Sequence, residues 1–212
     1  SEDRIGRGYY SLVLVNILTR ETHRVADNID PRFAWLGSKI VCSDTNSGEV
    51  WLIDKNSQHE VVFVEKDRGA SIEIHRAGTG RPIIISNTID STEIHLVTDE
   101  AKAEIVRERE PGHRYRIKFH ENKLFALSNL ETSDFDLAEI SLEKGPKKDW
   151  KFLDLKAEGT IFDFDITNMG FLLHTRSRLR EQIKLFTWDH SEIQIAEAGV
   201  GESLGLHSIV EG

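Results

Sequence analysis

The sequence has a single cysteine, few prolines and no long hydrophobic run, and each shortage excludes a class of protein. Cys42 leaves the chain without an internal disulfide, and its apolar surroundings indicate a buried, unreactive thiol. No run of about 18 apolar residues occurs, so the sequence predicts no transmembrane helix and no membrane partner. The prolines fall at expected strand starts or in linkers, where a missing N–H does not disturb a hydrogen-bond ladder. They are Pro31, Pro82, Pro111 and Pro146.

A basic excess is also missing from the composition. The chain has 27 Lys and Arg residues against 36 Asp and Glu residues, which gives a net charge of −9. Binding to nucleic-acid phosphates needs a basic face, so we do not expect nucleic acid as a partner. The hydrophobic share of 39% and the charged share of 30% are typical of a soluble globular protein. We expect it in the cytoplasm, with the periplasm as the alternative compartment.

The 212 residues are enough for one large domain or two small ones, and no change in composition marks a boundary. We therefore treat residues 1–212 as a single domain. The chain starts without a methionine and without a charged segment followed by an apolar one. Such a start is typical of a piece excised from a longer protein.

A short pattern recurs along the chain at a nearly constant spacing. Residues 47–54 read Ser-Gly-Glu-Val-Trp-Leu-Ile-Asp, two turn residues followed by a run of β-branched and aromatic side chains. Three later segments repeat this pattern. If Val50, Ile94, Leu137 and Ile183 are equivalent, the steps are 44, 43 and 46 residues. A period of this size, with several short strands inside it, indicates a propeller or a solenoid.

The expected strands alternate apolar and polar residues, and no useful stretch has the period of a helix, which excludes a helical solenoid. Four short antiparallel strands in about 40–45 residues form the blade of a β-propeller. The predicted fold is therefore all-β, a partial β-propeller of about four to five four-stranded antiparallel blades. A β-sandwich arrangement of separate domains is the alternative.

The expected blades follow one another along the chain. Segments 9–17 and 22–26 form a partial blade over residues 9–26, whose beginning is missing, and segment 33–36 begins the first full blade. A lone strand at 203–209 starts a further blade. The four full blades span about 32–65, 70–109, 115–155 and 160–197.

The second strands of the blades end in a similar way. Ser43, Ser86 and Ser128 each close an apolar run and are followed by Asp or Asn. These residue types form turns, because their side chains hydrogen-bond to the nearby backbone. The fourth blade departs from the pattern with His174 and Thr175.

Four segments carry a resemblance to a known family. They are Ser-Gly-Glu-Val-Trp-Leu-Ile-Asp at 47–54, Tyr-Arg-Ile at 115–117, Phe-Ala-Leu-Ser-Asn at 125–129 and Asp-Trp-Lys-Phe-Leu at 149–153. Their order and spacing resemble those of the N-terminal propeller of the prolyl oligopeptidase family, in its oligopeptidase B (protease II) branch. The resemblance covers most of the chain.

The resemblance implies a function for the chain. In that family a seven-bladed propeller caps an α/β-hydrolase domain that holds a Ser-Asp-His triad, and it admits only short peptides. This chain departs from the pattern, because it has about four and a half blades and no hydrolase domain. The expected function is therefore non-catalytic substrate gating in a serine oligopeptidase that cleaves short peptides after basic residues. The expected partners are the α/β-hydrolase domain of the parent chain and those peptides.

A free-standing propeller that binds a protein partner is the alternative, because a fold alone does not decide function. For this chain we assign no catalytic, cofactor-binding or metal residue, and the substrate-binding residues stay unknown. We expect no cofactor.

One catalytic motif matches the sequence. Residues 201–205, Gly-Glu-Ser-Leu-Gly, fit the G-x-S-x-G nucleophile elbow. An elbow needs a buried strand before it, a helix after it, and downstream Asp and His partners. Only seven residues follow Gly205, so we interpret the segment as a glycine-rich linker between blades.

Histidines and aspartates are possible metal ligands or acid–base groups. The nine histidines form no pair at metal-ligand spacing, so we expect them on strand faces and at the surface. Asp163 and Asp165 alternate on one strand and share a face, between Phe162 and Phe164. If that strand is innermost, the two carboxylates line the central channel or pack beside it.

The remaining candidate functional residues are arginines and tryptophans. Glutamates interleave with the arginines between Arg107 and Arg116, which indicates a solvated loop between blades; these arginines are Arg107, Arg109, Arg114 and Arg116. Residues 176–180, Arg-Ser-Arg-Leu-Arg, form the hairpin between second and third strands, where a domain contact and plain solvation stay open. We expect the tryptophans between blades; they are Trp35, Trp51, Trp150 and Trp188.

The incomplete blades at the two ends lead to a further expectation. An open arc leaves strand edges unpaired, and such edges tend to pair with another chain, so we expect self-association. Alternatively, the partial blade at 9–26 and the strand at 203–209 join within one chain and close a five-bladed ring.

Overall fold

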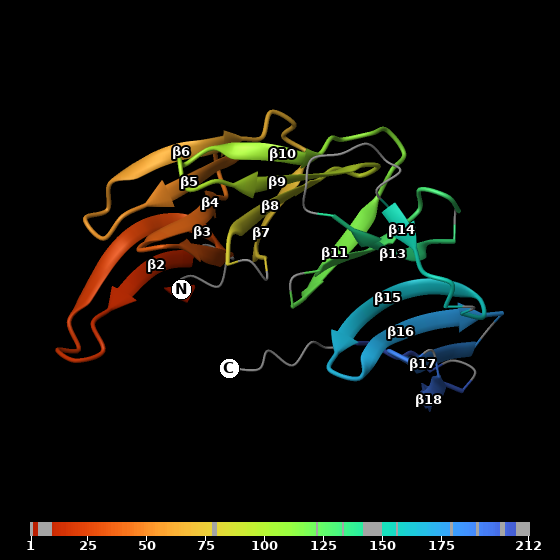
Figure 1. Cartoon of the computed structure of the whole chain (residues 1–212). Coiled ribbons are helices and arrows are strands. Elements are labelled where there is room, and N and C mark those ends of the chain that lie inside the picture. The colour runs from red at the N-terminus through yellow and green to blue at the C-terminus, as the bar shows by residue number, and fades with distance from the viewer. Residues whose placement is uncertain are drawn as a thin grey trace. The chain divides into compact units, whose positions relative to one another are not determined.

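The computed structural model describes residues 2–3, 10–77, 80–121, 123–132, 134–141, 150–155, 157–178, 180–189, 191–199 and 202–206. The regular elements of this part are all strands, so it holds no helix that could cross a membrane. The chain divides into two compact units, unit 1 with residues 1–112 and unit 2 with residues 113–212 (Figure 1).

Unit 1 begins with a six-stranded antiparallel sheet whose strands follow the order of the chain. Its strands are β1 (Glu2–Asp3), β2 (Tyr10–Val15), β3 (Thr22–Leu36), β4 (Lys39–Asp44), β5 (Glu49–Ile53) and β6 (His59–Val64). Short hairpins join β3 to β4 and β5 to β6, as expected for an up-and-down blade.

The long strand β3 replaces two strands that the sequence predicts at 22–26 and 33–36. Its first half pairs with β2 and its second half with β4, and the register shifts between Ile29 and Phe33. Pro31 lies within this irregularity, where its missing N–H does not break a regular ladder. The expectation that Pro31 stands at a strand start or in a linker is therefore wrong, because the strand continues past it.

The second sheet of unit 1 has four antiparallel strands in the order β10-β9-β8-β7. They are β7 (Ser71–Arg76), β8 (Pro82–Asn87), β9 (Thr92–Val97) and β10 (Ala103–Arg107). This sheet meets the first one along β7, which contacts β3 and β4. A buried cluster joins the two sheets; it consists of Ala34, Val41, Val50, Leu52, Ile74, Ile84 and Val97.

Unit 2 contains two further four-stranded antiparallel sheets. The first consists of β11 (Tyr115–His120), β12 (Lys123–Ser128), β13 (Asp136–Ile140) and β14 (Trp150–Phe152). The second consists of β15 (Thr160–Thr167), β16 (Gly170–Ser177), β17 (Arg180–Thr187) and β18 (Glu192–Glu197). They meet where β15 contacts β11 and β12, around a core of Phe125, Leu127, Leu137, Ile161, Phe164, Phe171, Leu173 and Phe186.

One strand of each sheet is buried on both faces, namely β4, β8, β12 and β16. In β4, Val41 packs into the core toward β7, whereas Ile40 and Cys42 pack on the other face against Leu12 of β2. Burial on both sides explains why such strands read as continuous apolar runs. It also raises the pKa of the Cys42 thiol to about 12. The predicted burial of this cysteine is confirmed.

Within the six-stranded sheet, the second half of β3 and the strands β4, β5 and β6 form a four-stranded set whose first strand is β3. Four-stranded antiparallel sets that meet along their first strands are the architecture of propeller blades. The predicted all-β class is confirmed. The expected strand at 203–209 is wrong for residues 203–206, which form an irregular segment, and residues 207–209 lie outside the described part, as does Tyr9. The assignment of blades to a single propeller domain stays a prediction.

Candidate functional site

The first strands of the sheets in unit 2 carry facing rows of opposite charge. The Arg116 guanidinium on β11 lies 3.6 Å from the Asp163 carboxylate on β15, and the Lys118 ammonium lies 3.6 Å from Asp165. Arg116 also donates to the carbonyl of Phe162 at 3.2 Å. Asp163 and Asp165 share a face, as their alternation predicts, and each faces a basic residue of the neighbouring first strand.

Unit 1 repeats this arrangement between β3 and β7. The Arg32 guanidinium on β3 donates to the carbonyl of Ile72 at 3.3 Å and lies 3.3 Å from the Glu73 carboxylate. The hydrogen bond from His75, together with the Arg32 charge, lowers the pKa of Glu73 even though burial opposes it. Asp30 orients Arg32 from its own strand at 2.7 Å.

In both units, therefore, an arginine on the first strand of one blade contacts two groups on the first strand of the neighbouring blade. One group is a backbone carbonyl, and the other is the carboxylate of the residue that follows it. The side chains of Arg32 and Glu73 are 41% and 32% exposed, and those of Arg116 and Asp163 are 65% and 38% exposed. Ion pairs this accessible stabilise a fold by about 1 kcal/mol or less each. These charges stay open to solvent.

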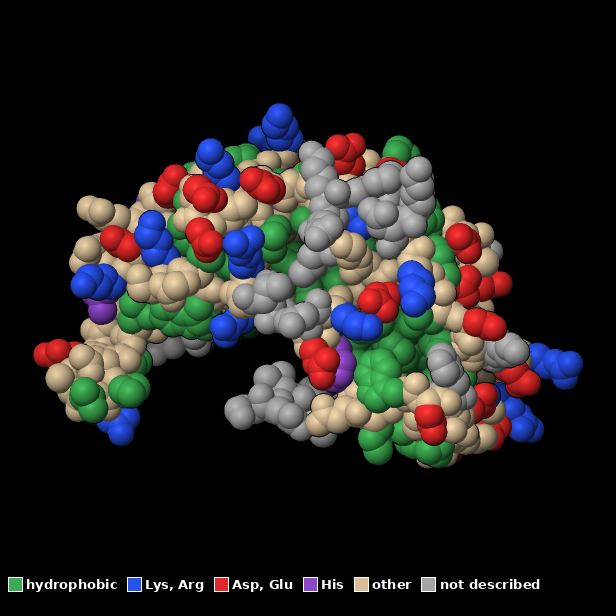
Figure 2. All heavy atoms as spheres, in the orientation of Figure 1, with side chains coloured by type: hydrophobic (Ala, Val, Ile, Leu, Met, Phe, Trp, Pro, Cys, Tyr) green, Lys and Arg blue, Asp and Glu red, His purple; other side chains and the backbone are tan. Residues whose placement is uncertain are grey.

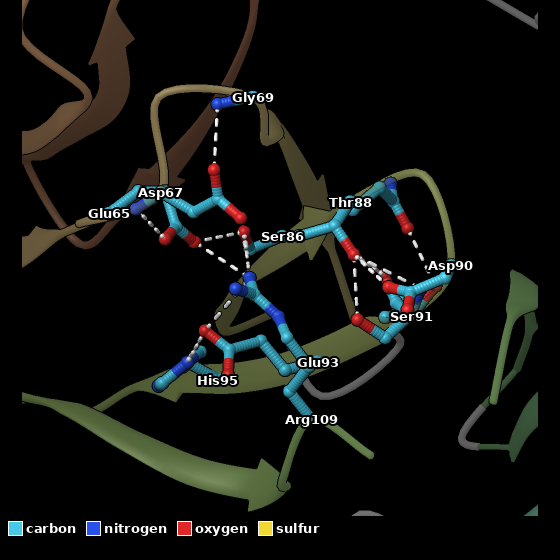
Figure 3. Close-up of polar contacts among 12 residues, drawn as sticks. Glu65, Asp67, Gly69, Ser86, Thr88, Asp90, Ser91, Glu93, His95 and Arg109 are labelled. Atoms are coloured by element: carbon cyan, nitrogen blue, oxygen red, sulfur yellow. Dashed lines mark hydrogen bonds and ion pairs between the residues drawn. The ribbon is translucent and has the colours of Figure 1, made fainter. Parts of the chain in front are cut away.

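A more buried polar network joins the two sheets of unit 1 (Figure 3). Glu65 follows β6, and its side chain is only 6% exposed. It accepts hydrogen bonds from the Ser86 hydroxyl at the end of β8 and from the Arg109 guanidinium at 2.8 Å. Arg109 also contacts the Ser86 hydroxyl at 2.7 Å and the Glu93 carboxylate at 3.5 Å. Burial raises the pKa of Glu65, but the bonds from Arg109 and Ser86 outweigh it, and the net pKa is lowered.

We expect Arg109→Met to destabilise unit 1 by about 2–3 kcal/mol, because it leaves the buried Glu65 carboxylate with one partner fewer. Urea unfolding would measure the loss. The exposed Arg68→Met variant is the matched control and should shift stability by less than about 0.5 kcal/mol. Equal losses in both variants would contradict a specific role for Arg109.

Glu181, at the start of β17, has the corresponding role in unit 2. Its carboxylate accepts a hydrogen bond from the backbone N–H of Leu204 at 2.9 Å, and further bonds from Arg176 and from His174 at 3.2 Å. The Leu204 N–H and the Arg176 guanidinium lower the pKa of Glu181 from an ordinary 4.5 to about 2. Glu181 thus holds the irregular segment 202–206 against the last sheet.

This low pKa predicts a pH dependence of stability. A carboxyl group whose pKa falls on folding stabilises the fold fully above its unfolded pKa, here 4.5, and loses that contribution as the pH falls toward 2. We expect Glu181→Gln to be less stable than the parent chain at neutral pH, and we expect this difference to shrink as the pH falls from 4.5 through 2. Urea midpoints measured across this range, with the exposed Glu131→Gln variant as control, would test it. A stability difference that does not change with pH would contradict the assignment.

The motif at 201–205 does not form an elbow in the described part of the chain. Gly201 lies outside the described residues, Glu202 accepts a hydrogen bond from the Gly199 N–H at 2.8 Å, and no helix follows within 202–206. Residues 202–206 form an irregular segment that the Leu204 N–H bonds to Glu181.

The described histidines contact separate partners instead of gathering at one place. His113 contacts the Ser128 hydroxyl at 2.9 Å, His95 contacts Glu93 at 3.2 Å, and His120 stacks on Trp188 with ring centroids 5.2 Å apart. Among the described residues, no three His, Cys, Asp or Glu side chains come together in a way that could hold a metal ion.

The arginine clusters are distributed differently from the expectation. Arg107 and Arg109 belong to unit 1, where Arg107 is buried and Arg109 lies in the Glu65 network, so a solvated loop is wrong for both. In the hairpin between β16 and β17, Arg176 pairs with Glu181 and Arg180 pairs with Glu197 at 3.0 Å. Two of the three arginines of that hairpin are therefore engaged within the sheet.

The tryptophans differ in their environments. Trp150 is buried against Tyr115, with ring centroids 5.1 Å apart, whereas Trp35 and Trp188 are 41% and 43% exposed. Trp51 is half-buried, and its ring lies tilted against that of His59 with centroids 4.9 Å apart. Trp188, although partly exposed, packs between the two sheets of unit 2, against His120 of β11 and Phe171 of β16. The expected packing between neighbouring sheets therefore holds for Trp188 and is wrong for the exposed Trp35.

Mixed charge is also visible on the surface of the molecule. The face drawn in Figure 2 carries Lys and Arg side chains interspersed with Asp and Glu side chains, without a continuous basic patch.

Sheet order, strand-to-strand packing and the charged first strands together define a protein of the β-propeller class. The family model for the N-terminal β-propeller domain of prolyl oligopeptidase matches residues 41–208. The chain therefore belongs to this family and forms part of its propeller domain. No curated protein matches the sequence at a significant level.

Solved structures share this fold. Oligopeptidase B from Leishmania major superposes with a TM-score of 0.67 and 17% identity, covering 85% of this chain and 28% of that chain. Oligopeptidase B from Trypanosoma brucei, in a closed form with covalently bound antipain, gives a TM-score of 0.60 and 18% identity, covering 83% and 27%. A structure from a study of two prolyl endopeptidases gives 0.66 and 10%, covering 91% and 32%. This chain thus spans less than a third of each of these structures.

Proposed function

We propose that this chain is the substrate-gating part of a two-domain serine oligopeptidase, in which an α/β-hydrolase domain performs the chemistry on short peptides. The membership of the propeller family carries the proposal. The facing charges on the first strands support it, because the innermost strands of a propeller line its central channel. In this role the chain's own residues admit or reject peptides and take no part in bond cleavage.

The charged first strands give the gate its selectivity. Arg116 and Lys118 face Asp163 and Asp165 across one seam, and weak, solvated ion pairs can exchange with the charges of a passing peptide at little cost. The seam must open further to admit an intact protein than to admit a short peptide. Removing the attraction across the seam should therefore relax the limit on substrate size.

A charge reversal in the parent enzyme tests this proposal. We expect Asp163→Lys combined with Asp165→Lys, which places like charges across the seam, to raise hydrolysis of casein several-fold relative to a short fluorogenic peptide. Glu60→Lys, on the exposed face of β6, is the control and should leave the ratio unchanged. An unchanged ratio in the double variant would contradict gating at this seam, and a parent without peptidase activity would contradict the proposal as a whole.

Self-association belongs to the same proposal. The outer strand β18 is the last strand of its sheet, and its Ile193 and Ile195 are 47% and 55% exposed. Edges of this kind pair readily with another chain. Light scattering of this chain should show a mass that rises with concentration, and a monomer at every concentration would contradict it.

A free-standing interaction module is the second candidate, and the hairpin between β2 and β3 favours it. Ile17 and Leu18 at its tip are 79% and 89% exposed, although Asn16 fixes the turn by accepting hydrogen bonds from the N–H groups of Leu18 and Thr19. An ordered turn that presents two large aliphatic side chains suits a protein contact. A reading frame that lacks a hydrolase region would favour this candidate.

A further inference from the structure

A cavity of about 230 Å³ lies at the seam between the two sheets of unit 2. It is open to solvent on one side and is lined by the start of β13, the segment after β14 and the start of β15, which lie together in Figure 1. Its floor is apolar and continuous with the core of the unit. The floor side chains are Phe135, Leu137, Leu153, Leu155 and Ile161.

The rim of this cavity is acidic. Asp134, Asp136 and Asp154 all line it. Asp136 accepts a hydrogen bond from Thr132 at 2.9 Å, and Asp134 accepts a long one from Thr160 at 3.5 Å. Within the described part of the chain, the exposed Asp154 carboxylate has no hydrogen bond and no ion pair. The rim therefore has unused capacity to accept hydrogen bonds.

Six basic side chains of unit 2 form ion pairs with acidic residues that do not line the cavity. Lys123 pairs with Glu139, Lys184 with Glu192, and Arg180 with Glu197. Arg116, Lys118 and Arg176 likewise pair with acids that do not line the cavity. None of these six cations neutralises the rim.

The backbone on both sides of the cavity has an unusual conformation. Phe135 has a φ of +60°, which is rare for an aromatic residue, and this conformation lets its half-buried ring contribute to the floor. Gly159 has a φ of +85°, and a Cβ there would lie 2.3 Å from the carbonyl oxygen of Arg176. Only glycine lets this wall approach β16 so closely.

We propose that the cavity binds one basic side chain, lysine or arginine, of a polypeptide partner. The volume is below the roughly 300–1,000 Å³ of pockets that hold a whole small molecule, so a single side chain fits better. The apolar floor matches the aliphatic stem of such a side chain, and the rim carboxylates match its charged head. This inference is independent of the proposed gating function, because the cavity is lined by none of the four charged residues of the gate and requires no hydrolase domain.

An NMR titration of the isotope-labelled chain with blocked amino acids tests the proposal. N-acetyl-arginine amide and N-acetyl-lysine amide are the probes, N-acetyl-norleucine amide carries the stem without the charge, and guanidinium carries the charge without the stem. We expect saturable amide shifts around residues 134–137 and 153–161 with at least one basic probe. We expect several-fold weaker binding of norleucine amide and of guanidinium.

Two variants give the titration its specificity. Asp154→Asn should weaken binding of the basic probe several-fold, and Glu158→Gln, which alters an exposed carboxylate nearby that does not line the cavity, should not. Saturable binding with this pattern supports the site. Absence of saturation, equal binding of guanidinium alone, or equal losses in the two variants would overturn it.

Discussion

Phe164→Ala should destabilise unit 2 by about 3–5 kcal/mol, which is the usual range for removing a buried aromatic ring. Phe164 is 1% exposed and lies on β15 at the centre of the core that joins the two sheets of the unit. Its strand neighbour across the ladder is Leu173, which is fully buried as well. The cavity left by the ring would therefore be surrounded by rigid sheet on both sides and would collapse only slightly.

Urea unfolding of the chain measures this loss, and Phe162→Ala is the matched control on the same strand. Phe162 is 40% exposed and packs under the Arg176 guanidinium at 4.7 Å, so its removal should cost only about 1 kcal/mol. Similar losses for the two positions would mean that β15 does not direct Phe164 into the core. The predicted seam between the sheets would then be wrong.

Gly170→Ala should cost about 3 kcal/mol or more, at the upper end of the usual range for point substitutions. Gly170 opens β16 with a φ of +149°, and a Cβ there would lie 2.0 Å from the carbonyl oxygen of Phe186 on β17. Because the obstructing atom belongs to the backbone of a paired strand, the sheet must shift to admit even a methyl group.

Gly37→Ala separates the steric effect from the conformational one. Gly37 also has a positive φ, of +59°, but no atom lies within 4 Å of the position of its Cβ. Its replacement should therefore cost only the strain of a left-handed residue, about 1–2 kcal/mol. Equal losses from urea unfolding at the two positions would contradict the close approach of β16 and β17.

Short apolar or alternating runs that are bounded by turn residues predict most strands of this chain. The runs at 82–87, 103–107 and 123–128 predict strands, and β8, β10 and β12 have these bounds. One exception is β3. Its polar middle reads as a break in the pattern, but pairing with β2 on one half and β4 on the other carries the strand through.

The candidate site is predictable only in part, because its contacts are made between sheets. Alternation alone places Asp163 and Asp165 on one face. Their partners Arg116 and Lys118 lie some 47 residues earlier and come together with them only when β11 meets β15. The sequence feature that predicts this contact is opposite charge on successive first strands. Arg32 and Glu73 show the same feature.

The local sequence does not predict the buried network around Glu65. Glu65 and Arg109 look like ordinary charged residues after strand ends, in stretches rich in both signs. Their pairing follows from the packing of the first sheet of unit 1 on the second, which leaves Glu65 almost without solvent. The sequence predicts Ser86 as a turn residue, whereas in the structure its hydroxyl bonds to both charged groups.

The coding sequence downstream of residue 212 tests the central claim most directly. If the chain is the gating part of an oligopeptidase, the reading frame should continue through further repeats of blade strands into a hydrolase region. That region should contain its own G-x-S-x-G motif followed by Asp and His, in the chain order of α/β-hydrolases. A stop codon shortly after Gly212 would contradict the claim and would leave a small propeller that acts by binding alone.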